Sequence, residues 1–174
     1  MLYLLIEYFH VLGAIVILGT GTGIAFFLLM AHRSRDVAFI AKTAEVVVLA
    51  DFVFTLSAVL LQPVTGGLMM WLSSTSIAEG WLTAALALYA LAGLFWVPVV
   101  FMQIEMRDLA RQAAGSGTAL PVRYFVLFRR WFLFGIPVVA LWGLAGPSGQ
   151  SLMTRRVAAD EQGALLGANG SIQG

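Results

Sequence analysis

The chain alternates between long apolar stretches and short polar segments. Four stretches are nearly free of charged residues, and they cover about residues 2–31, 46–71, 81–104 and 124–145. Each is close to or longer than the ~20 residues that a helix needs to cross a bilayer. The apolar runs are continuous rather than alternating with period two, which excludes a transmembrane β-barrel. The pattern predicts an all-α membrane protein, with a four-transmembrane-helix bundle within residues 1–146.

Residues 147–174 differ from the rest of the chain. They are rich in Gly, Ser, Gln and Ala and contain almost no aliphatic run. A segment of this composition buries too little apolar surface to offset the entropy of ordering. We expect a polar, disordered or weakly helical tail.

The composition agrees with residence in a membrane. Hydrophobic residues make up 60% of the chain and charged residues 11%, whereas soluble domains carry about 25% charged residues. The chain has no cysteine, which excludes disulfides, iron–sulfur clusters and thiolate-bound metals. The net charge of +1 does not indicate binding to nucleic acid.

The basic residues predict the orientation. They gather in the first and third connections between the apolar stretches, which carry Arg33, Arg35 and Lys42, and Arg107, Arg111 and Arg123. The N-terminal stub and the connection over 72–80 have no Lys or Arg. The positive-inside rule therefore places both basic connections in the cytoplasm. We expect a multi-pass protein of a bacterial inner membrane with both termini in the periplasm.

His10 is a titratable residue inside the first apolar stretch, where such residues are costly and indicate function. Glu7 precedes it by three positions, so the two share a helix face. At ~1.5 Å of rise per residue, His10 lies roughly 10 Å and Gln62 about 6 Å outward of their helix centres. We expect Glu7, His10 and Gln62 to form one cluster in the outer leaflet, with Glu7 orienting the imidazole.

Asp51 lies on the cytoplasmic side of the membrane centre. Helical rise places it roughly 10 Å from the centre, which separates it from His10. Arg129 and Arg130 enter the last apolar stretch at a similar depth. We expect a structural ion pair between Asp51 and Arg129 or Arg130, and the alternative is a proton- or ligand-binding role for Asp51.

Three interpretations of His10 stay open. It forms an interhelical hydrogen bond, it is an axial ligand of haem, or it is part of a proton relay. No second haem ligand is within reach on its helix, because His32 lies about 33 Å of helix rise away. Gly19 and Gly23 have the small-xxx-small spacing of close helix packing, which suits either the interior of one bundle or a homo-oligomer.

Short motifs stand out along residues 2–140. They are Tyr8-Phe9-His10-Val11-Leu12-Gly13, Gly19-Thr20-Gly21, Ala31-His32-Arg33-Ser34, Val48-Leu49-Ala50-Asp51, Leu61-Gln62-Pro63-Val64-Thr65-Gly66, Leu88-Tyr89-Ala90-Leu91-Ala92-Gly93 and Trp96-Val97-Pro98-Val99-Val100. With these motifs the chain resembles a family of predicted bacterial integral membrane proteins of unknown function. The resemblance implies four transmembrane helices and no established activity.

A more distant resemblance is to the four-helix haem-binding protoporphyrinogen oxidases and to copper-resistance membrane proteins of similar architecture. His10 and His32 are placed like the histidines of the oxidases, but the later helices of this chain have no lysine. The resemblance implies haem b bound at His10 and a redox role with a quinone or a porphyrin as partner. The alternative is a non-enzymatic membrane subunit or a transporter component whose intramembrane polar residues serve assembly or ion passage.

Overall fold

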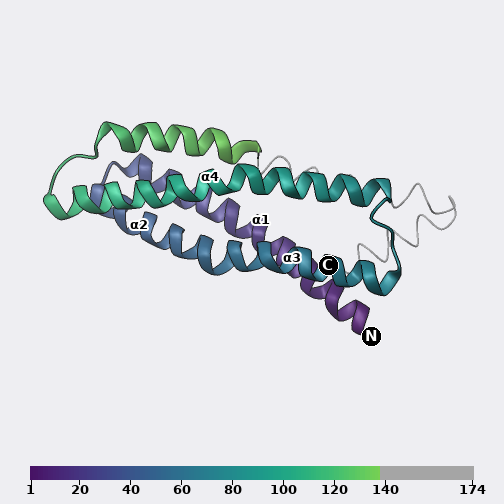
Figure 1. Ribbon diagram of the computed structural model, residues 1–174. Coiled ribbons are helices and arrows are strands. Elements are labelled where there is room, and N and C mark those ends of the chain that lie inside the picture. The colour runs from purple at the N-terminus through teal and green to yellow at the C-terminus, as the bar shows by residue number, and fades with distance from the viewer. Residues whose placement is uncertain (138–174) are drawn as a thin grey trace, which may run out of the picture.

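Antiparallel helices build the whole of the described structure (Figure 1). The structure is a computed structural model, and it describes residues 1–137. Its elements are α1 (Leu2–Ser34), α2 (Val37–Ala50), the π-helical turn η1 (Asp51–Thr55), α3 (Leu56–Ser73), α4 (Gly80–Ser116) and a last helix over 122–137. No strand occurs within residues 1–137. The prediction of an all-α membrane bundle is confirmed.

The elements α2, η1 and α3 join end to end into one helix over Val37–Ser73. This helix, α1 and α4 are each long and apolar enough to cross a membrane. The sequence predicts a fourth span over 124–145, of which the structure describes the helix 122–137. The residues 138–145 and the predicted tail 147–174 lie outside the described part of the chain.

The helices continue past the apolar stretches at one end of the bundle. α2 begins directly after Asp36, whose carboxylate accepts hydrogen bonds from the backbone N–H groups of Ala38 and Phe39 at 2.9 and 3.1 Å. α4 ends at Ser116, and Gly117 after it takes the left-handed conformation (φ 65°) that glycine adopts without strain. Residues 105–116, which follow the third apolar stretch, are thus helical.

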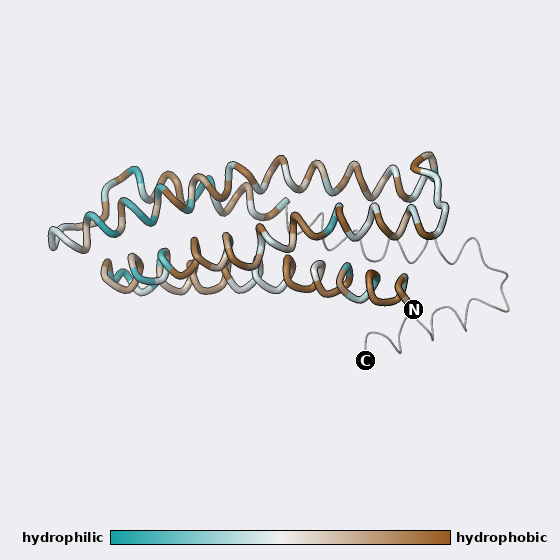
Figure 2. The backbone as a smooth tube through the Cα atoms, turned by 60° about the horizontal axis from the view of Figure 1, so that its bottom comes forward, coloured by the Kyte–Doolittle hydropathy of each residue, from teal (hydrophilic) through white to brown (hydrophobic). Residues whose placement is uncertain are grey.

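Most hydrophilic residues gather at the end of the bundle opposite the N-terminus (Figure 2). We call this region, formed by residues 31–45 and 105–123, the charged end. Both connections that carry basic residues lie here (Figure 1). Its ion pairs join Lys42 and Arg111 to Glu45, Arg107 to Asp108, and Arg123 to Glu105. The side of the membrane that the charged end faces stays a prediction.

The hydrophobic core lies next to the charged end. Its largest fully buried side chains come from four different helices, and they are Leu28, Ile40, Met106 and Tyr124. Small residues surround them and let the helix backbones approach, among them Ala31, Ala44 and Ala110. The ring of His32 stacks on Phe128 with centroids 3.8 Å apart. This half of the molecule is packed like the interior of a soluble domain.

Large apolar side chains cover the outside of the bundle. Phe101 on α4 is 67% exposed, and Leu94 is 70% exposed. On a soluble protein such a continuous apolar surface would aggregate, whereas a bilayer solvates it. The outer surface is that of a protein whose solvent is lipid.

Candidate functional site

His10 joins α1 to α3 at the N-terminal side of the bundle. Its Nδ1 lies 2.8 Å from Thr65 Oγ1, and Gln62 Nε2 donates to the backbone carbonyl of His10 at 2.7 Å. The structure thus brings Gln62 to His10, although to its backbone rather than to its ring. Thr65, the ring's partner, is absent from the sequence-based cluster.

The hydrogen bonds around Thr65 favour one tautomer of His10. The Thr65 hydroxyl also lies 2.8 Å from the carbonyl of Leu61, its i−4 position. A hydroxyl has a single proton, and donating it to Leu61 requires His10 Nδ1 to donate in turn. The arrangement leaves Nε2 of His10 as the ring atom with a free lone pair.

Glu7 acts on His10 through charge. The Glu7 carboxylate interacts electrostatically with the His10 ring, but no hydrogen bond between them occurs within residues 1–137. Thr65 is the residue whose side chain contacts the ring nitrogen, and the orienting role of Glu7 stays a prediction.

Two glycines allow α1 and α3 to approach at His10. A Cβ atom at Gly13 would lie 2.6 Å from Gln62 Nε2, and one at Gly66 would lie 3.4 Å from His10 Cε1. By contrast, a Cβ at Gly19 or Gly23 would have no neighbour within 4 Å. Within residues 1–137, the close packing predicted at Gly19 and Gly23 does not occur; it occurs at Gly13 and Gly66.

Asp51 is the most deeply buried acidic residue of the described chain, with 3% of its surface exposed. Its main partner is Gln103 on α4. With the Gln103 amide oriented to satisfy both neighbours, its nitrogen donates to Asp51 Oδ2 at 2.5 Å and its oxygen accepts from Trp131 Nε1 at 3.1 Å. The chain Asp51–Gln103–Trp131 links η1, α4 and the helix 122–137.

The ion pair predicted between Asp51 and Arg129 or Arg130 is not formed in the described structure. No ion pair within residues 1–137 includes Asp51, and both arginines are exposed. The reason is the rotation of the helix 122–137. Trp131 is buried and points inward, and successive residues lie about 100° apart around a helix, so Arg130 and Arg129 are turned away.

The π-helical turn η1 buries two polar groups on one face of a membrane helix. In η1 the two buried residues are Asp51 and Thr55, whereas Phe52, Val53 and Phe54 between them are about half exposed. The turn therefore presents its polar side chains inward and its apolar ones to lipid. Single π-helical turns inside α-helices are frequent at functional sites.

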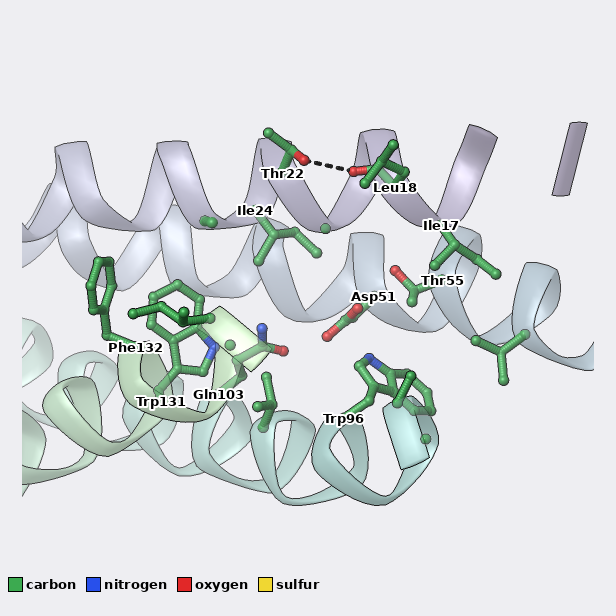
Figure 3. A pocket seen from close by; sticks show the side chains of 18 of the residues that line it. Ile17, Leu18, Thr22, Ile24, Asp51, Thr55, Trp96, Gln103, Trp131 and Phe132 are labelled. Carbon is green, nitrogen blue, oxygen red and sulfur yellow. Dashed lines mark hydrogen bonds between the residues drawn. The ribbon is translucent and has the colours of Figure 1, made fainter. Parts of the chain in front are cut away.

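A cavity of about 510 Å³ opens beside Asp51, between α1, η1, α3, α4 and the helix 122–137 (Figure 3). Aliphatic and aromatic side chains form most of its wall. Asp51, Thr55, Trp96 and Gln103 form one polar cluster in this wall, and the Thr55 hydroxyl has no hydrogen-bond partner within residues 1–137. Figure 3 shows these side chains pointing toward one another from η1 and α4.

Tyr89 closes another part of the cavity wall. Pro63 in α3 has no N–H, so the carbonyl of Val59 lacks its usual partner four residues on. The Tyr89 hydroxyl on α4 donates to that carbonyl at 2.6 Å. This bond satisfies a backbone group that would otherwise be costly in lipid, and it fixes α4 against α3 beside the cavity.

The sequence analysis missed Thr55, Trp96, Gln103 and Tyr89. A signal existed for Gln103, which is a polar residue inside an otherwise apolar run at about the depth of Asp51. The reasoning that selected Gln62 applies equally to Gln103. Nothing in the sequence distinguishes Trp96 from an aromatic residue that faces lipid.

The fold and the buried polar cluster define a class: a polytopic α-helical membrane protein with an internal cavity. The chain belongs to the family described as "Predicted integral membrane protein (DUF2269)", whose model matches residues 4–144. Comparison with curated proteins and with solved structures found no match. The site must therefore be interpreted from its own chemistry.

The residues that line the cavity do not fit a haem. They include neither histidine nor methionine, and the hydroxyl of Tyr89 is bonded to Val59. Within residues 1–137 no group of three or more His, Cys, Asp or Glu side chains could hold a metal ion. Haem ligation by His10 stays a prediction, and a haem on His10 would lie outside this cavity.

Proposed function

We propose that the protein binds a small, largely apolar molecule inside the membrane, in the cavity beside Asp51. The observation that carries this proposal is a cavity of about 510 Å³ with an apolar wall and a single polar cluster. Sites for small organic ligands have volumes of about 300–1,000 Å³, apolar walls and a few convergent polar groups.

The wall supplies the affinity, and the polar cluster supplies the orientation. Trp96, Trp131 and Phe132 present ring surfaces to the cavity from two helices (Figure 3). Aromatic rings bury large areas and stack on the rings of a ligand. Asp51 and Thr55 then fix which end of the ligand lies at η1, because a polar group of the ligand finds partners only there.

The experiment uses the protein in lipid nanodiscs and a neutral naphthalene that carries a diazirine. After irradiation, mass spectrometry locates the labelled residues. We expect saturable labelling of residues that line the cavity, and competition by unlabelled naphthalene. Labelling that never saturates and lies only on outward-facing residues would overturn the proposal.

A matched pair of variants tests whether the cavity is the site. Gly21 lines the cavity and Gly19 does not, and a Cβ at either position has no neighbour within 4 Å. A leucine at position 21 extends into the cavity, so Gly21→Leu should weaken binding about tenfold, which is a change of about 1.4 kcal/mol. Gly19→Leu should leave binding unchanged. Equal effects of the two substitutions would contradict the proposal.

Haem ligation by His10 is a separate proposal. It is supported by the Nδ1 bond to Thr65, since ligating imidazoles commonly donate through the nitrogen that does not bind the metal. The test is a reduced-minus-oxidised spectrum of protein produced with ample haem. A Soret band that disappears in His10→Ala supports it, and the absence of a band in the wild type rejects it.

A further inference from the structure

We infer that the ligand of the cavity is a hydrophobic organic cation, and that it binds to the Asp51 carboxylate in exchange for a proton. The inference rests on the proposed cavity binding and adds the charge of the ligand. It is supported by the absence of charge on the described groups around Asp51.

Every neighbour of the Asp51 carboxyl group within the described residues 1–137 is neutral. Its neighbours are the amide of Gln103, the hydroxyl of Thr55 and the indole of Trp96. The residues of α1 that line the cavity include no titratable or charged side chain, and those of the helix 122–137 include none either. Tyr89 is the one other titratable lining residue of the described chain, and its hydroxyl is bonded to Val59. Within residues 1–137, a carboxylate here has no opposite charge beside it.

A buried carboxylate without a counter-charge is strongly unfavourable in a medium of low dielectric constant. Two states of the site avoid this. In one, Asp51 carries a proton and the cavity is free of charge. In the other, the proton has left to water and a cation in the cavity balances the carboxylate. Cation binding and proton release are then one exchange, with the net charge of the site unchanged.

The surroundings of Asp51 suit a hydrophobic cation. Gln103 donates to Asp51 Oδ2, and the neighbouring Thr55 and Trp96 side chains carry no charge. The rings of Trp96, Trp131 and Phe132 line the same cavity, and aromatic faces attract cations. This combination suits a quaternary ammonium, a phosphonium or a delocalised aromatic cation with apolar substituents.

The probes for the test are tetraphenylphosphonium and tetraphenylborate, which have similar shape and opposite charge. The protein is studied in nanodiscs of uncharged phosphatidylcholine, in weakly buffered solution with a pH indicator. We expect the cation to compete with the neutral naphthalene and to release about one proton for each cation bound. Below the pH at which Asp51 gains its proton, cation affinity should fall about tenfold for each unit of pH.

Asp51→Asn is the decisive variant, since it keeps the size of the side chain and removes the exchangeable charge. It should weaken cation binding at least about tenfold and abolish proton release, while the neutral naphthalene still labels the cavity. Asp108→Asn is the control, because Asp108 is half exposed at the charged end and pairs with Arg107. It should change neither measurement.

The outcomes separate the two proposals. If the naphthalene labels the cavity but the cation binds Asp51→Asn as well as the wild type, or binds without releasing protons, this inference is wrong and the proposed function stands. Equal binding of tetraphenylborate also overturns it. If neither the cation nor the naphthalene binds the wild type, the proposed function fails as well.

Discussion

The two halves of the bundle differ in how their helices are packed. Next to the charged end, four helices meet around fully buried side chains such as Tyr124 and Met106. Toward the N-terminus, the cavity lies beside the turns of the helix 122–137 that carry Trp131, Phe132, Gly135 and Ile136. In that half α1 packs along α3, and their contacts include the hydrogen bonds and glycine approaches at His10.

This difference separates stability from binding within one fold. Dense packing leaves no room for a ligand, whereas a cavity forgoes contacts that would stabilise the protein. The half next to the charged end therefore holds the helices in place. The open half can then keep a polar cluster and an empty volume without losing the fold.

The largest expected effect concerns the side of the membrane on which each half lies. The basic connections predict that the charged end is cytoplasmic, so reporter fusions at residues 38 and 115 should behave as cytoplasmic and one at 76 as periplasmic. The measurement is the activity of paired reporters that work on only one side. A periplasmic signal at 115 would invert the whole arrangement.

The second prediction compares packing in the two halves. Tyr124 is fully buried at the charged end, so Tyr124→Ala should reduce the free energy of unfolding by about 3–5 kcal/mol. Phe132 lines the cavity and is 44% exposed, so Phe132→Ala should cost clearly less. Denaturant titration in detergent measures both. Equal losses would show that the two halves are packed alike.

The smallest expected effect compares the polar contacts of the two halves. Gln103→Leu removes the donor to Asp51 Oδ2 and the acceptor of Trp131 Nε1, so it should cost about 1–3 kcal/mol. Thr65→Ala removes a single interhelical bond to His10, which should cost about 1 kcal/mol or less in a membrane protein. The same titration measures both. If Thr65→Ala has the larger effect, the His10 contact rather than the Asp51 cluster fixes the open half.

Single residues show how far the sequence could predict the site. Helical depth correctly indicated that His10 and Gln62 are neighbours, and that Asp51 lies apart from both. Helical rise could not identify the partner of Asp51, because Gln103, Arg129 and Arg130 all lie at a similar depth in the membrane. The choice among them depends on how α4 and the helix 122–137 are rotated about their axes.

The sequence by itself determined the class of the protein. The length and continuity of the apolar stretches require helices in a membrane, since only helices satisfy their own backbone in lipid when no barrel pattern exists. It also determined that both basic connections lie at one end of the bundle. Successive helices run in opposite directions, so the first and the third connection lie at the same end. These properties depend only on the order of residues along each helix.

The tertiary structure alone decided what surrounds Asp51. Helix rotation and the π-helical turn η1 place Thr55, Trp96 and Gln103 around its carboxyl group and turn Arg129 and Arg130 outward. The outcome depends on the packing of all helices at once, because the side chain that meets a neighbour changes with about 100° of rotation per residue. A carboxyl group among neutral partners, beside an apolar cavity, is the product of that packing.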